Sequence, residues 1–293
     1  MIDQFLNYLR YERNASPQTV LTYEEGLREF ESYLSFRDEG LSLEKVDTDL
    51  IRDWMESLMD KGNNASTINK KLSALRSFYR FALKRKLVDR DPAHCITGPK
   101  KSKPLPQFLR ESEMDNLLDA IEWGEKYKDV RARTILLLFY EAGLRRAELT
   151  GLNDADVDFD TKQLKVTGKR NKQRIIPFGE ELSQVLSHYI AVRNEQVVRK
   201  TEGALFLSDK GMRMTGEQVY QIVHKYLTAV TSLKKRSPHV LRHTFATAML
   251  NNGAGLESIK NLLGHESVST TEIYAHTTFE QLKRVYKEAH PRA

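Results

Sequence analysis

Six side chains of this 293-residue sequence could act together on a phosphate ester. They are two arginines, a lysine, two histidines and a tyrosine: Arg145, Arg242, Lys169, His239, His265 and Tyr274. Guanidinium groups match the equatorial oxygens of a five-coordinate phosphorus, and one well-aimed donor can contribute on the order of 3 kcal/mol. A histidine can take the proton of an attacking tyrosine, and a lysine can protonate the leaving oxygen. The set therefore suits phosphoryl transfer without a metal.

Each of these residues alone has a plainer explanation. Arg145 follows a glycine break after an apolar stretch and could form an internal ion pair with Glu148. Lys169 is predicted in a turn, where most lysines are only solvated. Tyr274 could be a half-buried packing residue, and His265 a core histidine with satisfied hydrogen bonds. Only their combination in one chain supports the chemical hypothesis.

A predicted helix start positions two of the six groups. Ser237 and Pro238 are typical of an N-cap and a first helical residue. His239 and Arg242 then share one face of the first turns, where free backbone amides favour an anion. His239 and His243 are also spaced like a zinc pair, but the glutamate of a His-Glu-x-x-His motif is absent and no third ligand is obvious. We therefore expect no metal.

A small sheet and a further helix would carry three more groups. Three strand-like runs are predicted at residues 157–160, 163–167 and 173–178. Residues 168–171 read as a hairpin turn that presents Lys169. Ser269 and Glu272 form a predicted capping box, so Tyr274 falls in the early turns of a new helix.

The first ninety or so residues are predicted to form a helical unit. Ser16 and Pro17 begin a helix that runs to about Leu34, Thr48 can cap a second helix, and Ser66 a third. Beyond this unit, helices are expected at 111–121, at 131–142 and from about residue 180 onward.

The predicted helix after Ser66 carries charges of one sign. No acidic residue interrupts its basic residues, which include Lys70, Lys71, Arg76, Arg80 and Lys84. Most charged helix faces are simply solvated, but soluble helices usually mix signs. A basic face behind an apolar stripe favours contact with phosphates, so we assign these five residues to DNA binding.

Composition is typical of a globular protein that could bind an anionic partner. Lysine and arginine number 46 against 40 acidic residues, a net charge of +6, and 40% of residues are hydrophobic. The single cysteine, Cys95, can form neither an internal disulfide nor a cysteine metal cluster. The start lacks the features of a secretory signal, and the longest apolar run is far shorter than the ~20 residues of a membrane span. We expect a cytoplasmic protein without a membrane partner.

Residues 98–107 divide the chain. They contain three prolines, one glycine and three lysines, which predicts an extended linker. The expected fold is therefore mainly α with a small β-sheet, in two domains: helical residues 1–97 and a mixed α+β domain over 108–293.

Four motifs resemble those of the tyrosine recombinases, also called the lambda-integrase family, and are most similar to its Xer branch. They are the arginine box 143–149, the lysine hairpin 168–177, the His-x-x-Arg box 239–242, and His265 followed by Tyr274 after nine residues. The resemblance covers the whole chain, including the ending 290–293. It implies a SAM-like core-binding DNA-binding domain, a linker, and a catalytic domain with a C-terminal tail helix.

The resemblance also implies a role for each site residue. Tyr274 would attack the scissile phosphate of a double-stranded recombination site, leaving a 3′-phosphotyrosyl bond and a free 5′-hydroxyl. Lys169 would protonate the leaving oxygen, and His239 would manage the tyrosine proton or bind phosphate. The remaining three would hold the phosphate's charge: Arg145, Arg242 and His265. The covalent link conserves bond energy, so no cofactor is expected.

Similar enzymes work as tetramers of identical or paralogous subunits and pass through a Holliday junction. Their C-terminal helix docks into a neighbouring subunit, and the apolar-polar mix of Glu280, Leu282, Val285 and Tyr286 suits such a helix. The short chain favours resolution of chromosome dimers at a dif-like site, with a cell-division DNA translocase as a partner. A mobile-element integrase with the same chemistry is the alternative.

Three other functions compete with recombination. A type IB topoisomerase uses a similar pocket, but the two-domain layout and the tail argue against it. A non-catalytic DNA-binding protein would not need all six positions filled. A helical protein-interaction module leaves both the basic helix and the six residues unexplained.

Overall fold

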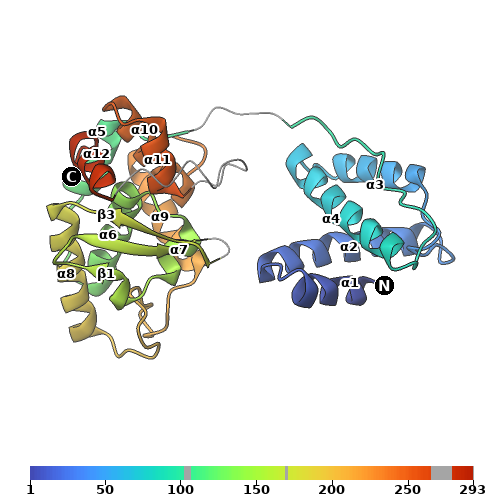
Figure 1. Cartoon of the computed structure of the whole chain (residues 1–293), viewed down its shortest axis with the longest axis horizontal. Helices are drawn as coiled ribbons and strands as arrows, with labels where there is room; N and C mark the ends of the chain where they lie inside the picture. Colours follow the sequence, from blue (N-terminus) through green and yellow to red (C-terminus); the bar gives the residue numbers. More distant parts are fainter. Residues whose placement is uncertain (102–106, 169–170, 265–278, 293) are drawn as a thin grey trace. The chain divides into compact units, whose positions relative to one another are not determined.

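The protein consists of two compact units, Met1–Pro104 and Leu105–Ala293. The computed structural model describes residues 1–101, 107–168, 171–264 and 279–292 (Figure 1). Each unit encloses its own apolar core. Helices dominate the described residues and one small sheet accompanies them, which confirms the predicted fold class.

The first unit is entirely helical in the regular structure of its described residues. Its elements are α1 (Ile2–Asn7), the π-helix η1 (Tyr8–Glu12), α2 (Pro17–Arg37), α3 (Thr48–Asp60) and α4 (Ala65–Lys84). Helix α4 packs against α1, α2 and α3. An aromatic cluster fills the centre, where Phe5 meets Phe78 edge to face and Phe30 lies against Trp54.

Two helices of this unit begin differently from the prediction. Ser16 caps α2 as expected, with its hydroxyl accepting from the Thr19 amide. The cap of α3 is Asp47 rather than Thr48, and the cap of α4 is Asn64 rather than Ser66. In both cases an earlier carboxylate or amide oxygen accepts from an amide three residues on, so the helix begins sooner.

The second unit surrounds one central helix. Its elements are α5 (Glu111–Asp115), the π-helix η2 (Asn116–Ala120), α6 (Tyr127–Ala142), α7 (Arg146–Gly151), the 3-10 helix η3 (Asp154–Asp156), β1 (Val157–Asp158), β2 (Gln163–Thr167), β3 (Gln173–Pro177), α8 (Glu180–Gln196), α9 (Gly216–Val230), α10 (Pro238–Asn251), α11 (Leu256–Leu263) and α12 (Phe279–Ala289). Helix α6 is buried on nearly every side and packs against α8, α9 and α10. It therefore anchors whatever follows its C-terminal end.

The sheet is antiparallel, in the order β1-β2-β3. Leu164 pairs with Ile176, and Val166 pairs with Arg174, so the hairpin predicted over 163–178 is present. Helices α7, α11 and α12 contact the sheet (Figure 1). The sheet thus adjoins the helix ends that flank the predicted site residues.

Helix α12 packs on the second unit of its own chain. Tyr286 and Ala289 are buried, and Leu282 and Val285 are partly buried against α10, α11 and β3. These include side chains that we expected to dock into a neighbouring subunit, and in this chain they complete the core beside α6. None of the helices in the described part of the chain has the length and apolar character that a membrane span requires.

Candidate active site

Arg145 and Arg242 converge on one buried carboxylate. Helix α6 ends at Gly143 in the left-handed conformation, and Arg145 is the N-cap of α7. The Arg145 amide donates to Glu148 Oε2 over 2.8 Å, and its Nη1 donates to Oε1 over 2.7 Å. From α10, Arg242 Nη1 lies 3.8 Å from Glu148 Oε2. The internal ion pair considered for Arg145 therefore exists, and it also brings the two arginines together.

Three successive backbone carbonyls at the end of α11, those of residues 262–264, accept hydrogen bonds from three different arginines. The bonds are 2.7 Å from Arg174 Nε to Leu262, 2.6 Å from Arg242 Nη2 to Leu263, and 2.8 Å from Arg145 Nη2 to Gly264. The last carbonyls of a helix lack intrahelical partners and lie at its negative end. The arginines thus cap α11 and hold it against α7 and α10.

Glu148 is anionic in this setting. It is only 4% exposed, and Arg174 bonds both of its oxygens, with Nη1 to Oε1 and Nη2 to Oε2 each 2.9 Å. Burial acts to raise the pKa of Glu148, but the hydrogen bonds and charge of Arg174, together with Arg145, lower it to about 2. Three guanidinium groups around one carboxylate leave an excess of positive charge, which is the sign that a phosphodiester needs.

Arg242 remains a cation although it is buried. Burial and the nearby charge of Arg145 lower the pKa of Arg242 to about 10, while Glu148 opposes that change. Its Nη1 also donates to the carbonyl of Gly143 over 2.5 Å. A fixed, desolvated cation of this kind stabilises developing negative charge more strongly than one in water.

His239 is suited to accept a proton. Ser237 is the N-cap of α10 and Pro238 its first residue, as predicted, although the Ser237 side chain makes no capping hydrogen bond. Partial desolvation lowers the pKa of His239 below its ordinary value, and the charges of His243 and Arg242 add to the effect. A histidine with a lowered pKa is neutral near pH 7 and can act as a base. Among the described residues, no group of three His, Cys, Asp or Glu side chains is arranged to hold a metal ion.

Lys169, His265 and Tyr274 lie outside the described residues, as does the capping box predicted before Tyr274. Gly168 directly precedes Lys169, and Gly264 directly precedes His265. Both glycines lie against the arginine cluster, which we define as Arg145, Arg174 and Arg242 around Glu148. A Cβ atom on Gly168 would be 3.3 Å from Glu148 Oε1, and one on Gly264 would be 3.1 Å from Arg174 Cδ. The described chain therefore leads to the cluster directly before Lys169 and directly before His265.

Two residues that organise the cluster were not among the predicted site residues. Glu148 was expected only as a possible ion-pair partner, and Arg174 lies within the hairpin motif without an assigned function. Arg174 is on β3 opposite Val166, and its side chain is 13% exposed. Arg174 and the buried Ile176 are two positions apart on β3, so they lie on the same face of the strand. A charged residue at such a position is a signal that could have drawn attention to Arg174.

The five residues assigned to DNA binding lie on α4 of the first unit. Three of them are exposed, namely Lys70, Arg80 and Lys84. Lys71 forms an ion pair with Glu29 over 2.5 Å. Arg76 is half-buried and donates to the carbonyl of Ile96. The exposed three present their charge directly to solvent, whereas the other two also have partners within the unit.

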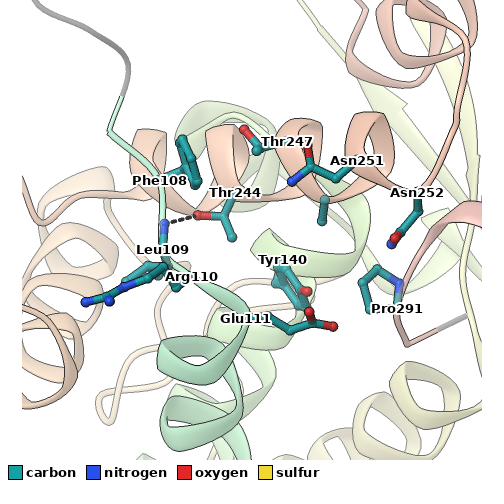
Figure 2. A pocket seen from close by; sticks show the side chains of 11 residues that line it. Phe108, Leu109, Arg110, Glu111, Tyr140, Thr244, Thr247, Asn251, Asn252 and Pro291 are labelled. Carbon is teal, nitrogen blue, oxygen red and sulfur yellow. Dashed lines mark hydrogen bonds between the residues drawn. The ribbon is translucent and has the colours of Figure 1, made fainter.

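A separate pocket of about 250 Å³ lies on another face of α10. Figure 2 shows its lining, with Thr244 and Asn251 from α10 facing Tyr140 of α6 and the segment around Leu109. The Leu109 amide donates to the Thr244 hydroxyl over 2.9 Å, which holds that segment on the helix (Figure 2). Of the predicted site residues that the structure describes, which are Arg145, His239 and Arg242, none lines this pocket.

Family models match the chain in two segments. The N-terminal SAM-like domain of phage integrases matches residues 2–86, and the phage integrase family matches residues 107–281. A tyrosine recombinase XerC of Pelotomaculum thermopropionicum is 38% identical, covering 100% of this chain and 98% of its own length. A tyrosine recombinase XerD of Oceanobacillus iheyensis is 35% identical, with 100% and 98% covered.

Solved structures share the fold. A XerH site-specific recombinase bound to a palindromic difH substrate has a TM-score of 0.72 at 22% identity, covering 99% of this chain and 82% of its own. The Tn1549 transposon integrase in complex with circular intermediate DNA has a TM-score of 0.67 at 22% identity, with 97% of each chain covered.

Proposed function

Since this chain belongs to the phage integrase family and is a tyrosine recombinase, a DNA strand-exchange enzyme that acts at specific sites, we propose that Tyr274 is its nucleophile. The family defines the reaction class. The assignment of individual residues in this chain is our own and follows from their positions in the motifs and around the cluster.

The observation that carries the proposal is the shared anchoring of Arg145 and Arg242. Both are held by Glu148 and by the carbonyls of residues 263–264, which directly precede His265. Two guanidinium groups fixed side by side can bind two oxygens of one phosphate. In the proposal, His265 joins them, and the three together stabilise the charge that develops on the five-coordinate phosphorus.

The remaining residues would move protons. Tyr274 loses its hydroxyl proton, with His239 as the acceptor, and its oxygen forms a bond to phosphorus. The bond from phosphorus to the 5′-oxygen breaks, and Lys169 protonates that oxygen. A 5′-hydroxyl from the partner duplex then attacks the 3′-phosphotyrosyl bond and releases Tyr274. Each step exchanges one phosphoester for another, so the cycle is balanced without a nucleotide cofactor.

The basic face of α4 would bind the DNA backbone. We assign this role to Lys70, Lys71, Arg76, Arg80 and Lys84, with the exposed Lys70, Arg80 and Lys84 making the direct contacts. Phosphate contacts of this kind fix the position of a protein on the duplex but do not read its sequence.

We further propose that the chain resolves chromosome dimers at a dif-like site through a Holliday junction. It would act in a tetramer with itself or a paralogue, and with a cell-division DNA translocase. Full-length relatives named XerC and XerD at 35–38% identity support this role over that of a mobile-element integrase. The comparable transposon integrase is only 22% identical.

A suicide substrate tests the nucleophile. A candidate site nicked next to the scissile phosphate releases a short fragment after cleavage, which traps the covalent complex. We expect a denaturation-resistant protein–DNA adduct with the unaltered chain and none with Tyr274→Phe, while both bind the DNA.

Tyr220→Phe, at a half-buried tyrosine of α9, is the matched control and should form the adduct. An adduct that persists in Tyr274→Phe would refute the assignment. Relaxation of supercoiled DNA that lacks the site would instead favour a topoisomerase.

A further inference from the structure

We propose that Arg174 is a positioning residue for DNA cleavage: it fixes Glu148 and the end of α11, and through them Arg145 and Arg242. The proposal builds on the function proposed above and adds a residue that does not itself touch the phosphate. It assigns to β3 a part in organising the site.

Arg174 bonds two groups on different elements, the carboxylate of Glu148 and the carbonyl of Leu262, and we call this arrangement a clamp. Its two Nη atoms lie 2.9 Å from the two oxygens of Glu148, a bidentate pairing that fixes the carboxylate plane. Its Nε donates to the carbonyl of Leu262 over 2.7 Å. All three guanidinium nitrogens therefore face protein groups. Arg174 is engaged in holding other residues rather than directed at a substrate.

The clamp joins three elements, β3, α7 and α11, each of which is close in the sequence to a proposed catalytic residue. Arg174 lies on β3, five residues after Lys169 in the sequence, while Glu148 lies on α7 beside Arg145. Leu262 lies near the end of α11, three residues before His265. A displacement of Glu148 would move Arg145 and Arg242, and a displacement of Leu262 would move the end of α11. An error of about 1 Å in such a site can cost on the order of 100-fold in rate.

Arg174 also keeps the shared carboxylate charged. The cations that face Glu148 are Arg145 on α7, Arg174 on β3 and Arg242 on α10. Burial acts to raise the pKa of Glu148, and among the interactions that lower it to about 2 the contribution of Arg174 is the largest. Without Arg174, burial would raise the pKa of Glu148 toward the working range. A protonated Glu148 would hold Arg145 and Arg242 less firmly.

A purely structural role for Arg174 would lead to a different result. If Arg174 only stabilised the fold, its loss would lower the melting temperature, and the surviving folded protein would cleave DNA with an unchanged pH profile. A positioning role requires that the rate of the folded protein falls, and that it falls more at acid pH, where Glu148 gains a proton.

The experiment compares Arg174→Lys and Arg174→Met with Arg131→Met in the full chain. Arg131 is also buried and bound to a carbonyl and a carboxylate, those of Leu207 and Asp209, but lies away from the cluster. The readouts are DNA affinity, melting by circular dichroism, and the rate of adduct formation on the suicide substrate from about pH 5.5 to about pH 8.5.

We expect both Arg174 variants to bind DNA nearly as well as the unaltered chain and to form the adduct about 10- to 100-fold more slowly. Their rate relative to the unaltered chain should fall further as the pH is lowered. The rate of Arg131→Met relative to that of the unaltered chain should not change with pH. Adding Glu148→Gln to Arg174→Met should remove the pH dependence, because the titrating group is gone.

Three outcomes would overturn the proposal. The first is a rate of adduct formation, relative to the unaltered chain, that is independent of pH in both Arg174 variants. The second is a loss of rate no greater than that of Arg131→Met, and the third is failure of both Arg174 variants to fold. The unaltered chain and Tyr274→Phe are measured alongside. Failure of the proposed function would show as an adduct in Tyr274→Phe, whereas failure of the Arg174 proposal would leave that control negative.

Discussion

At the scale of single residues, two buried glutamates of the catalytic unit show how neighbouring side chains determine whether a carboxyl group is charged. Glu148 and Glu141 are both almost inaccessible, at 4% and 0% exposure. The arginines around Glu148 lower its pKa to about 2, whereas burial and the charge of Glu181 raise the pKa of Glu141 to about 8. Glu141 Oε2 accepts a hydrogen bond from the Tyr286 hydroxyl over 3.2 Å, and its Oε1 has no partner among the described residues. One carboxylate is a fixed anion, and the other is mostly neutral near pH 7.

This contrast predicts how stability depends on pH. The folded pKa of Glu141 lies above its unfolded value of about 4.5, so its contribution to stability is full below about pH 4.5 and is lost as the pH rises toward 8. Glu141→Gln removes that loss. The difference in unfolding free energy between this variant and the unaltered chain should grow from about pH 5 to about pH 8, by up to about 1.4 kcal/mol per pH unit. Urea unfolding across this range measures it.

Glu148→Gln is the control for Glu141→Gln. The pKa of Glu148 is depressed, so its contribution is present above about pH 4.5 and is lost as the pH falls toward 2. Its difference from the unaltered chain should therefore be constant between about pH 5 and about pH 8. Parallel curves for the two variants would contradict the opposite shifts.

At the scale of elements, the site is built where helices end. Helix α6 ends at Gly143 (φ +56°) and α11 ends at Gly264 (φ +63°), both in the left-handed region that favours glycine. The carbonyls of both glycines accept from the proposed catalytic arginines. A helix that continued past either glycine would carry these carbonyls away from Arg242 and Arg145.

Gly143→Ala should therefore destabilise the protein. A Cβ atom there would lie 2.5 Å from Phe245 Cδ1 and 2.9 Å from Leu263 Cδ2, in addition to the strain of a positive φ. We expect a loss of about 2–4 kcal/mol, from about 1 kcal/mol of backbone strain and the rest from overpacking. Thermal or urea unfolding measures the loss.

Gly253→Ala separates the two causes. Gly253 has a φ of +85°, and a Cβ atom added there would meet no other atom within 4 Å, so only the strain of about 1 kcal/mol applies. Equal losses for the two variants would show that contact with Phe245 is relieved at no cost.

At the scale of the whole molecule, basic side chains occur in both of two units that have separate cores. Unit Met1–Pro104 carries the basic helix α4, and unit Leu105–Ala293 carries the arginine cluster. The basic charge is therefore placed in two ways, exposed on α4 and buried in the second unit. The first suits binding along a DNA backbone, and the second suits stabilisation of one phosphate.

The salt dependence of DNA binding tests the role that we propose for the exposed basic residues of α4. Lys84→Gln or Arg80→Gln should each reduce the slope of log affinity against log salt by about 0.9, the value for one lost phosphate contact. Lys71→Gln should have a smaller effect, because Lys71 is paired with Glu29. Fluorescence anisotropy over a salt series gives these slopes.

Lys45→Gln serves as the control, at an exposed lysine between α2 and α3 outside the basic face. It should leave the slope unchanged. A loss of slope equal to that of Lys84→Gln would mean that the basic charge of this unit acts as a whole and that α4 has no special part.

Local signals in the sequence determined much of the architecture. The Ser16 cap, the glycine end of α6, the start of α10 at Pro238 and the strand Gln163–Thr167 were all predicted from a few neighbouring residues. Such features depend on backbone preferences and hydrogen bonds that act within one turn of helix or one hairpin. The motif spacing further named six site residues, and the roles of all six stay predictions. The structure describes the positions of Arg145, His239 and Arg242.

Apart from the Arg145–Glu148 ion pair, which the sequence suggested, only the tertiary structure decided what holds Arg145 and Arg242. Arg174 and Glu148 are 26 residues apart, Arg242 and Gly143 are 99 apart, and Arg145 and Gly264 are 119 apart. No periodicity or cap signal reaches across such distances, because these contacts form only after α6, α7, α10, α11 and β3 have packed. The sequence alone shows which groups could act on a phosphate. Packing determines that Arg174 and Arg242 join Arg145 at Glu148 and which carbonyls hold the arginines in place.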